Sequence, residues 1–436
     1  MLLKILLPTT LIASFSLSLN GLVLAQTPSE ILVRRAVSET PTESQDAIAT
    51  LRAQGPTGLQ AFLKTYENQL STATNPQLRA TLDRLCQQRD CYASRLYWYT
   101  DLEQAKAAAK ATGKPILSLR LLGRLDEDLS CANSRFFRVA LYPNAEVSKV
   151  LRDRFILHWQ SVRPAPKVTI DFGDGRKLER TLTGNSIHYV LDAQGRPIDA
   201  LPGLYGPKAF LRQLEQAEQI VKQANSMTGE ARDNVVRQYY RDRLATIQAN
   251  WTADLSKLGI PSPTGLAEIP TEIPTAEEAA QAAMSKRYVE MPIISAISRN
   301  QDILTTATDE KAWESIAELH TQDTRLDSNS QALMRHKNPN AYDVSRQGIT
   351  PGSTDDPLMP VVQKFESLMA LDTVRNQYLL QPKIYAWLLE GQFDEVDNLN
   401  ELIYSQLFLT PNSDPWLGLL PSDAYTAIDN EGVIQE

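Results

Sequence analysis

Gly113-Lys114-Pro115-Ile116-Leu117 opens the stretch that decides the fold of this chain of 436 residues. Residues 115–122 are apolar and short enough to form a buried strand, and a polar loop over 123–130 follows them. A helical pattern then runs over 131–152, with Cys131 at its start. The local order is therefore strand, loop and helix, with a cysteine where the helix begins.

The sequence on either side extends this unit into alternating strands and helices. Thr100 and Glu103 predict a capping box for an Ala-rich helix that ends at Gly113. Downstream, apolar runs predict further strands and a closing helix, over residues 155–159, 168–172, 178–182, 187–191, 197–201 and 210–221. The second and third of these strands flank a glycine-containing turn and predict a hairpin. Layers of this kind place a central sheet between helices.

Several of these motifs resemble an exported bacterial thioredoxin-like family. In that family a Gly-Lys-Pro strand leads to a Cys-x-x-Cys helix, and here Gly113-Lys114-Pro115 leads to Cys131-x-x-Ser134. The similarity continues in three further segments: Glu146-Val147 to Phe155-Ile156, Tyr189 to Gly195, and Gly203-Leu204-Tyr205. The resemblance implies an α/β thioredoxin-like domain, with a central mixed sheet flanked by helices. It also implies that Cys131 occupies the place of the nucleophilic cysteine.

Three features depart from the pattern of that family. Ser134 replaces the resolving cysteine, which excludes an intramolecular disulfide at this site. The loop over 123–130 is longer than usual and carries acidic residues, whose charges oppose a nearby thiolate. Ser186, or Asn185 beside it, stands where the resemblance places a cis-proline. Each departure removes something that a dithiol redox cycle uses.

Two hypotheses for Cys131 follow. At a helix N-terminus, free N–H groups favour a thiolate, and the Ser134 hydroxyl is placed to donate a hydrogen bond to it. A single thiolate can attack a disulfide of an exported protein, which is monothiol oxidoreductase or isomerase chemistry. Alternatively, Cys131 is a packed residue of a scaffold that has lost its redox cycle. We favour this alternative, a non-catalytic binding or scaffold protein whose partners are exported proteins or peptides.

The other two cysteines, Cys86 and Cys91, are close in sequence and predict a short disulfide loop. The alternative is that all three cysteines are buried thiols. Zinc is disfavoured because no second Cys or His pair stands nearby at ligand spacing, and we predict no cofactor or metal. His158 and His188 fall in predicted strands, where histidines mostly pack within the sheet. The spacing does not require either of them to form a catalytic grouping with Cys131 and Asp171.

The N-terminus has the pattern of a secretory signal peptide. Lys4 precedes an apolar stretch that closes on Val23-Leu24-Ala25, which predicts cleavage after Ala25 and a periplasmic or secreted protein. An uncleaved membrane anchor is the alternative. No later run approaches the roughly 20 apolar residues of a membrane helix. The formal net charge of −8 and the lack of a dense basic run disfavour nucleic acid as a partner.

The predicted organisation has five parts. They are a signal peptide over 1–25, a helical region over 26–95, the thioredoxin-like domain over 96–225, a helix and proline-rich linker over 226–275, and a mainly helical C-terminal domain over 276–436. The sequence assigns no function to the last part.

Overall fold

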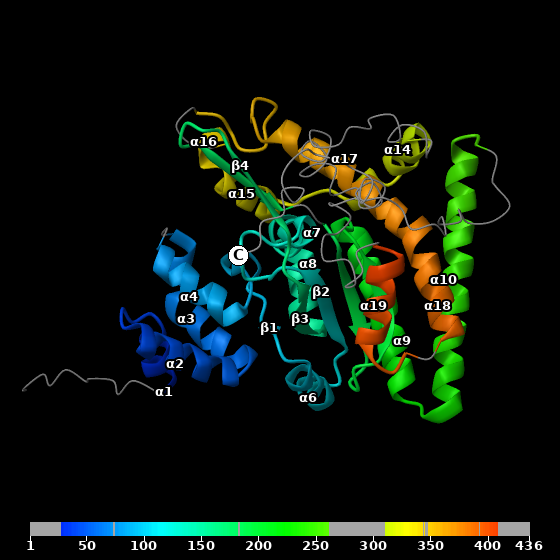
Figure 1. Ribbon diagram of the computed structural model, residues 1–436, viewed down its shortest axis with the longest axis horizontal. Coiled ribbons are helices and arrows are strands. Elements are labelled where there is room, and N and C mark those ends of the chain that lie inside the picture. Colours follow the sequence, from blue (N-terminus) through cyan, green and yellow to red (C-terminus); the bar gives the residue numbers. More distant parts are fainter. Residues whose placement is uncertain are drawn as a thin grey trace, which may run out of the picture.

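The computed structural model describes residues 28–72, 75–181, 184–260, 310–342, 344, 348–391 and 393–408. The predicted signal peptide and the proline-rich part of the predicted linker lie outside these residues and stay predictions. Figure 1 shows a sheet at the centre of the described chain, a group of helices on one side of it, and the long helix α10 (Gly229–Lys257) on the other side.

The first described residues form a small helical unit with its own core. Its helices are α1 (Pro28–Ala36), α2 (Pro41–Ala53), α3 (Pro56–Thr72), α4 (Pro76–Cys86) and the short α5 (Cys91–Ser94). The first four helices begin with a proline, whose missing N–H costs nothing in the first turn of a helix. Leu51, Phe62 and Leu82 are among its fully buried core residues. The predicted helical patterns of this region are thus helices in the structure.

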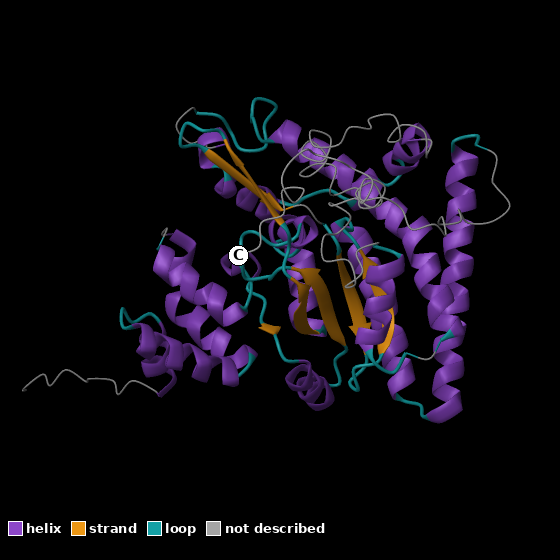
Figure 2. Ribbon diagram, in the orientation of Figure 1, coloured by secondary structure: helices purple, strands orange, loops and turns teal. Residues whose placement is uncertain are grey.

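The central sheet is mixed and has five strands: β1 (Trp98–Tyr99), β2 (Ile116–Leu122), β3 (Ile156–Arg163), β6 (Ser186–Leu191) and β7 (Pro197–Pro202). Their order across the sheet is β1-β3-β2-β6-β7 (Figure 2). Strands β1 and β2 each pair in parallel with β3, whereas β6 pairs antiparallel with β2 and β7 pairs antiparallel with β6. The predicted α/β class with a central mixed sheet is therefore confirmed.

A separate hairpin follows β3. Its strands are β4 (Lys167–Asp171) and β5 (Lys177–Thr181), which pair antiparallel with each other and lie outside the main sheet. Gly173 and Gly175 take positive φ values of 75° and 90° in the turn, where glycine has no Cβ to clash. The predicted hairpin is confirmed, and Figure 1 shows it extending away from the sheet toward α15 (Ser328–Lys337) and α16 (Pro339–Tyr342).

Two helix predictions need correction. The helix α6 (Leu102–Thr112) is capped by Asp101, which accepts a hydrogen bond from the Gln104 N–H at 3.0 Å, so the predicted capping box of Thr100 and Glu103 is wrong by one residue. The predicted helix over 131–152 is interrupted. It consists of α7 (Ala132–Phe136), the π-helix η1 (Phe137–Leu141) and α8 (Ala145–Arg154). Asn144 caps α8 by accepting from two backbone N–H groups, which starts a new helix there.

The closing helix of the sheet region is α9 (Pro207–Asn225), and α10 (Gly229–Lys257) runs back along it. The described C-terminal residues form α14 (Glu310–Glu318), η3 (Thr321–Asp323), α15 (Ser328–Lys337), α16 (Pro339–Tyr342), α17 (Met359–Arg375), η4 (Asn376–Leu380), α18 (Gln381–Glu390) and α19 (Val396–Gln406). The predicted helical character of the C-terminal region is confirmed. In the part of the chain that the structure describes, no helix is long and apolar enough to cross a membrane.

The C-terminal helices share one buried core with the sheet. Arg120 of β2 forms an ion pair with Asp397 of α19, with 2.7 Å between Nη2 and Oδ1. The Tyr189 hydroxyl of β6 donates to Asn400 Oδ1 of the same helix at 3.1 Å. The sheet face that carries Arg120 and Tyr189 is therefore covered by a helix more than two hundred residues downstream of β2. Buried residues before 225 and after 310 thus belong to one core.

Candidate functional site

Cys131 lies at the end of the central strand β2, where the chain turns into α7. Its N–H donates to the Leu122 carbonyl at 3.0 Å, which ties the residue to the last position of that strand. The side chain has no exposed surface and belongs to the main core. Two tyrosines, Tyr142 and Tyr404, lie close enough to interact with it electrostatically. Burial, and secondly this cysteine, raise the pKa of both phenols well above their usual range.

Ser134 is also fully buried, and its hydroxyl serves the loop before α7. It lies 2.5 Å from Ser130 Oγ and donates to the carbonyl oxygen of Cys131 at 2.9 Å. A hydroxyl has one proton, so a Ser134 that donates to this carbonyl does not donate to the thiol. The expected hydrogen bond to a Cys131 thiolate is therefore not part of this structure, and Ser134 stabilises the turn that places the cysteine.

Ser186, the third predicted site residue, lies at the same end of the sheet. It pairs with Leu121 near the end of β2 and has no exposed surface. Its Oγ has no hydrogen-bond partner among the described residues, and the described chain contains no cis peptide bond. The Tyr404 hydroxyl of α19 donates to the Asn185 carbonyl at 3.2 Å, directly beside it. The end of α19 therefore closes the edge of the sheet that holds Cys131 and Ser186.

The two strand histidines are core residues. His158 Nδ1 lies 2.8 Å from Ser118 Oγ, and His188 Nε2 lies 2.7 Å from the Tyr142 hydroxyl. Burial lowers the pKa of each histidine to about 3, so both are neutral at physiological pH. Asp171 is on the exposed hairpin, where its carboxylate is 3.1 Å from Lys177 Nζ. The structure therefore does not assemble these residues into a base for the cysteine.

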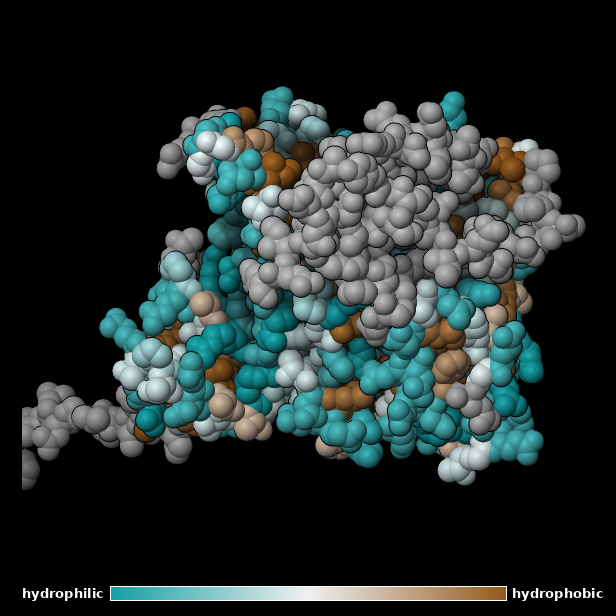
Figure 3. All heavy atoms as spheres, in the orientation of Figure 1, coloured by the Kyte–Doolittle hydropathy of each residue, from teal (hydrophilic) through white to brown (hydrophobic). Residues whose placement is uncertain are grey.

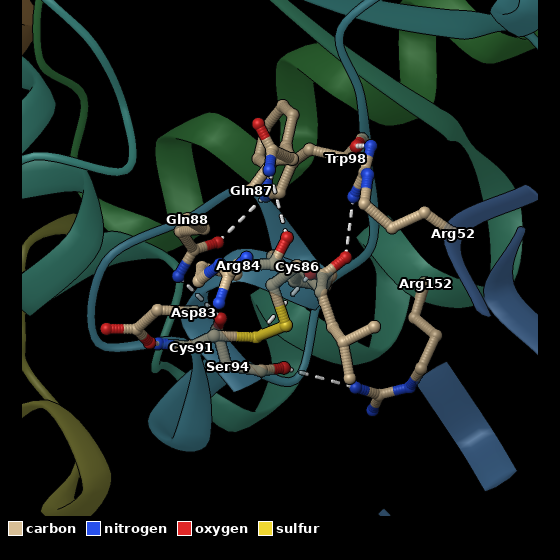
Figure 4. Close-up of a disulfide and its surroundings, with 12 residues drawn as sticks. Arg52, Asp83, Arg84, Cys86, Gln87, Gln88, Cys91, Ser94, Trp98 and Arg152 are labelled. Carbon is tan, nitrogen blue, oxygen red and sulfur yellow. Dashed lines mark hydrogen bonds between the residues drawn. A yellow bond between two sulfur atoms is a disulfide. The ribbon is translucent and has the colours of Figure 1, made fainter. Parts of the chain in front are cut away.

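Cys86 and Cys91 lie together as a disulfide, in agreement with the predicted pairing (Figure 4). Their Cα atoms are 6.3 Å apart, and both side chains are fully buried. Asp83 accepts a hydrogen bond from the Cys91 N–H at 2.9 Å. Burial, and secondarily the neighbouring Asp90 carboxylate, raise the pKa of Asp83 to about 6.

The loop closed by this disulfide connects the helical unit to the sheet. Gln88 of the loop accepts a hydrogen bond from Trp98 Nε1 of β1 and donates one to Ser94, both at 2.8 Å. Arg52 of α2 donates to the carbonyls of Leu85 and Trp98 from the opposite side (Figure 4). The disulfide therefore lies where the core of the helical unit meets the core around the sheet.

A cavity of about 560 Å³ was not predicted from the sequence. It lies between η1, the β4–β5 hairpin, α15 and α17, and its walls combine apolar residues with Arg135, Arg138, Arg180 and Lys337. These cations come from three separate segments of the chain, so no local motif marks them. A periodic pattern shows which face of one helix is apolar, but not which distant basic side chains converge on it.

The described residues contain no group of three or more His, Cys, Asp and Glu side chains that could hold a metal ion. Comparisons of the chain with protein-family models, with curated proteins and with solved structures found no match.

Proposed function

We propose that this chain is an exported thioredoxin-like protein that binds a partner and performs no thiol-disulfide exchange. The burial of Cys131, which has no exposed surface, carries the proposal. Thiol-disulfide exchange requires the attacking sulfur to reach the sulfur of its substrate. A thiol enclosed by core residues and by the end of α19 does not meet that requirement.

The thioredoxin-like part of the proposal is supported by the order of elements. The Gly-Lys-Pro segment leads into β2, and Cys131 stands where the next helix begins. After β3, the antiparallel strands β6 and β7 end at Gly203, whose φ is 74°, and the chain then enters α9. This order is the one that the resemblance implies. The inserted β4–β5 hairpin and the covering helix α19 are additions to it.

Position 134 holds a serine where a second cysteine would be needed, and this supports the proposal that the protein performs no thiol-disulfide exchange. Ser134 cannot resolve a mixed disulfide, and its hydroxyl already donates to the Cys131 carbonyl. In the same region, the hydroxyl of Ser130 and the backbone around it accept hydrogen bonds from Arg135 and Arg138. The polar groups around Cys131 thus stabilise a turn.

Thiol alkylation tests the proposal. The mature protein is treated with a maleimide at pH 7 and pH 8.5, folded and in denaturant, beside the variants Cys131→Ser and Cys86→Ser/Cys91→Ser. We expect Cys131 to react only in denaturant. Rapid labelling of Cys131 in the folded protein, together with Cys131-dependent mixed disulfides in envelope extracts, would overturn the proposal and support monothiol exchange. N-terminal sequencing of the exported protein tests the proposed cleavage after Ala25.

A further inference from the structure

The cavity beside η1 has the size and the composition of a ligand site. Its volume of about 560 Å³ falls in the range of roughly 300 to 1,000 Å³ that is typical for small-molecule pockets. Its apolar wall includes Phe136, Val139, Met334, Val361 and Phe365. The rings of Phe136 and Phe365 meet across two elements, with centroids 4.9 Å apart. Figure 3 shows hydrophobic residues gathered at the surface near the start of α17.

The basic end of the cavity contains a buried cation with incomplete partners. The Arg138 side chain is 2% exposed, and its Nε has no hydrogen-bond acceptor among the described residues. Its nearest carboxylate, Asp90, is 3.5 Å away, and its hydrogen bonds to the Asp128 carbonyl and Ser130 Oγ are 3.3 and 3.4 Å long. A buried guanidinium is stabilised by short bidentate contacts, so Arg138 is suited to receive an anion.

The π-helix η1 places this arginine and part of the apolar wall in the same cavity. Arg138, Val139 and Ala140 are consecutive residues of η1, and all three line it. Single π-helical turns occur frequently at functional sites, because they reorient side chains at the cost of regular helical hydrogen bonds. The irregular helix is a second feature of this wall, independent of the charges.

The charge around the cavity is predominantly positive. Arg135, Arg138, Arg180 and Lys337 line it, against the single carboxylate of Asp128. Asp128 is itself bound to Arg89, 3.0 Å away, and to Lys337, 3.5 Å away. Lys337 also contacts Asp90 at 2.6 Å, whereas Arg180 is exposed on β5. Two arginines among the lining residues, the buried Arg138 and the exposed Arg180, are therefore the cations nearest to hand for an anionic group.

We propose that this cavity binds an amphipathic carboxylate of the fatty-acid class. The carboxylate lies at Arg138 and Arg180, and the hydrocarbon chain lies against Phe136, Val361 and Phe365. An apolar wall with a cationic end is complementary to a ligand that has one acidic head and one apolar chain. The inference rests on the proposed binding function, to which it adds a site and a ligand class.

The test measures binding of laurate to the full mature protein by titration calorimetry, below the concentration at which laurate forms micelles. Lauryl alcohol and dodecyltrimethylammonium have the same chain length, one without charge and one with a positive charge. We expect saturable binding of one laurate per chain, and affinities at least tenfold weaker for the other two probes. No saturable binding of laurate, or equal affinity for laurate and the alcohol, would overturn the proposal.

Paired variants locate the site. Val361→Glu places a carboxylate in the apolar wall, and Gln363→Glu adds the same charge on an exposed position of α17 outside the cavity. Arg180→Gln removes a cation at the rim, and Arg176→Gln removes one from the exposed turn of the same hairpin. We expect laurate affinity to fall at least tenfold in Val361→Glu and about threefold in Arg180→Gln. The two controls should bind as the wild type does, and equal losses in a variant and its control would contradict the assignment.

The same titration on Cys131→Ser separates this inference from the proposed function. Laurate binding should be unchanged in this variant, because the cavity does not include Cys131. If Cys131 reacts readily in the folded protein while laurate binds, the non-catalytic proposal fails and the ligand site stands. If Cys131 is inert and laurate does not bind, the ligand site fails and the non-catalytic proposal stands.

Discussion

Arg120, in the central strand of the sheet, and Asp397, near the start of α19, are joined by an ion pair of 2.7 Å. The arginine side chain is 1% exposed and the aspartate side chain is 64% exposed, so a surface carboxylate compensates a charge inside the core. Gln160 of β3 also accepts from Arg120, at 2.6 Å. This contact holds α19 over the sheet, and α19 in turn closes the edge at Cys131.

Asp397→Asn should destabilise the protein. Burial lowers the pKa of Arg120, which reflects the cost of holding its charge in the core, and Asp397 offsets part of that cost. Loss of the pair should lower the free energy of unfolding by about 1 to 3 kcal/mol, the range for breaking a hydrogen bond to a buried charged group. Urea denaturation measures it. Glu395→Gln makes the same charge change at an exposed position of the same segment and should change stability by less than about 0.5 kcal/mol.

Tyr404→Ala should expose Cys131. The tyrosine is 1% exposed and interacts electrostatically with Cys131 from the end of α19, so we expect its truncation to open a path to the thiol. We expect maleimide labelling of folded protein to accelerate at least tenfold, with a loss of about 3 to 5 kcal/mol in stability. Tyr404→Phe retains the ring and loses only the hydrogen bond to Asn185, so its thiol should stay unreactive. Equal labelling of the two variants would show that the ring does not shield Cys131.

Local patterns predicted the elements of the sheet because each strand and helix is marked by its own residues. Residues 115–122 are almost continuously apolar, as expected for a strand buried on both faces, and they form β2. The two helix predictions that the structure corrects, the cap of α6 and the unbroken helix over 131–152, also depend on neighbouring residues. Asp101 and Thr100 are both good helix caps, and periodicity does not choose between neighbours. The apolar spacing of 131–152 also continues across the break before Asn144.

Two features could not be predicted from the sequence for a different reason. They are the position of α19 over Cys131 and the cavity beside η1. Both depend on contacts between β2, η1 or the hairpin and helices far downstream, and no local pattern encodes which helix packs where. Arg120 was an available signal, because it is the one charged residue in the mostly apolar strand β2. Such a residue requires a partner, but the sequence does not identify Asp397 among the other carboxylates.

Asp83→Asn should stabilise the protein near neutral pH. Burial raises the pKa of Asp83 from 3.8 to about 6, so the folded state binds a proton more tightly than the unfolded state. Its contribution is fully present below pH 3.8 and is lost as the pH rises through about 6. Asparagine does not ionise, so the variant does not lose this stability as the pH rises. Its side-chain oxygen still accepts the hydrogen bond from the Cys91 N–H. We expect a gain of up to about 3 kcal/mol at pH 7, and little gain at pH 4.

Urea denaturation between pH 4 and pH 7 measures this gain. Asp46→Asn, on an exposed position of α2, provides the matched change of charge and should follow the wild type across the range. A stability difference for Asp83→Asn that does not change with pH would mean that Asp83 ionises in the folded protein as it does in the unfolded chain.

His188→Gln should reduce the sensitivity of the protein to acid. Burial lowers the pKa of His188 from 6.5 to about 3, so the folded state binds a proton less tightly than the unfolded state. The resulting stability is present above pH 6.5 and is lost as the pH falls toward 3, by about 2 to 3 kcal/mol between pH 7 and pH 4.5. Glutamine retains a polar partner for the Tyr142 hydroxyl but does not titrate.

The His188→Gln variant should be less stable than the wild type at pH 7, because its side chain packs less well against Phe137 and Phe210. Its stability should fall less than that of the wild type between pH 7 and pH 4.5. The double variant His158→Gln/His188→Gln should make stability depend even less on pH, because burial lowers the pKa of His158 to about 3 as well. An unchanged acid slope in both variants would assign the acid sensitivity to other groups.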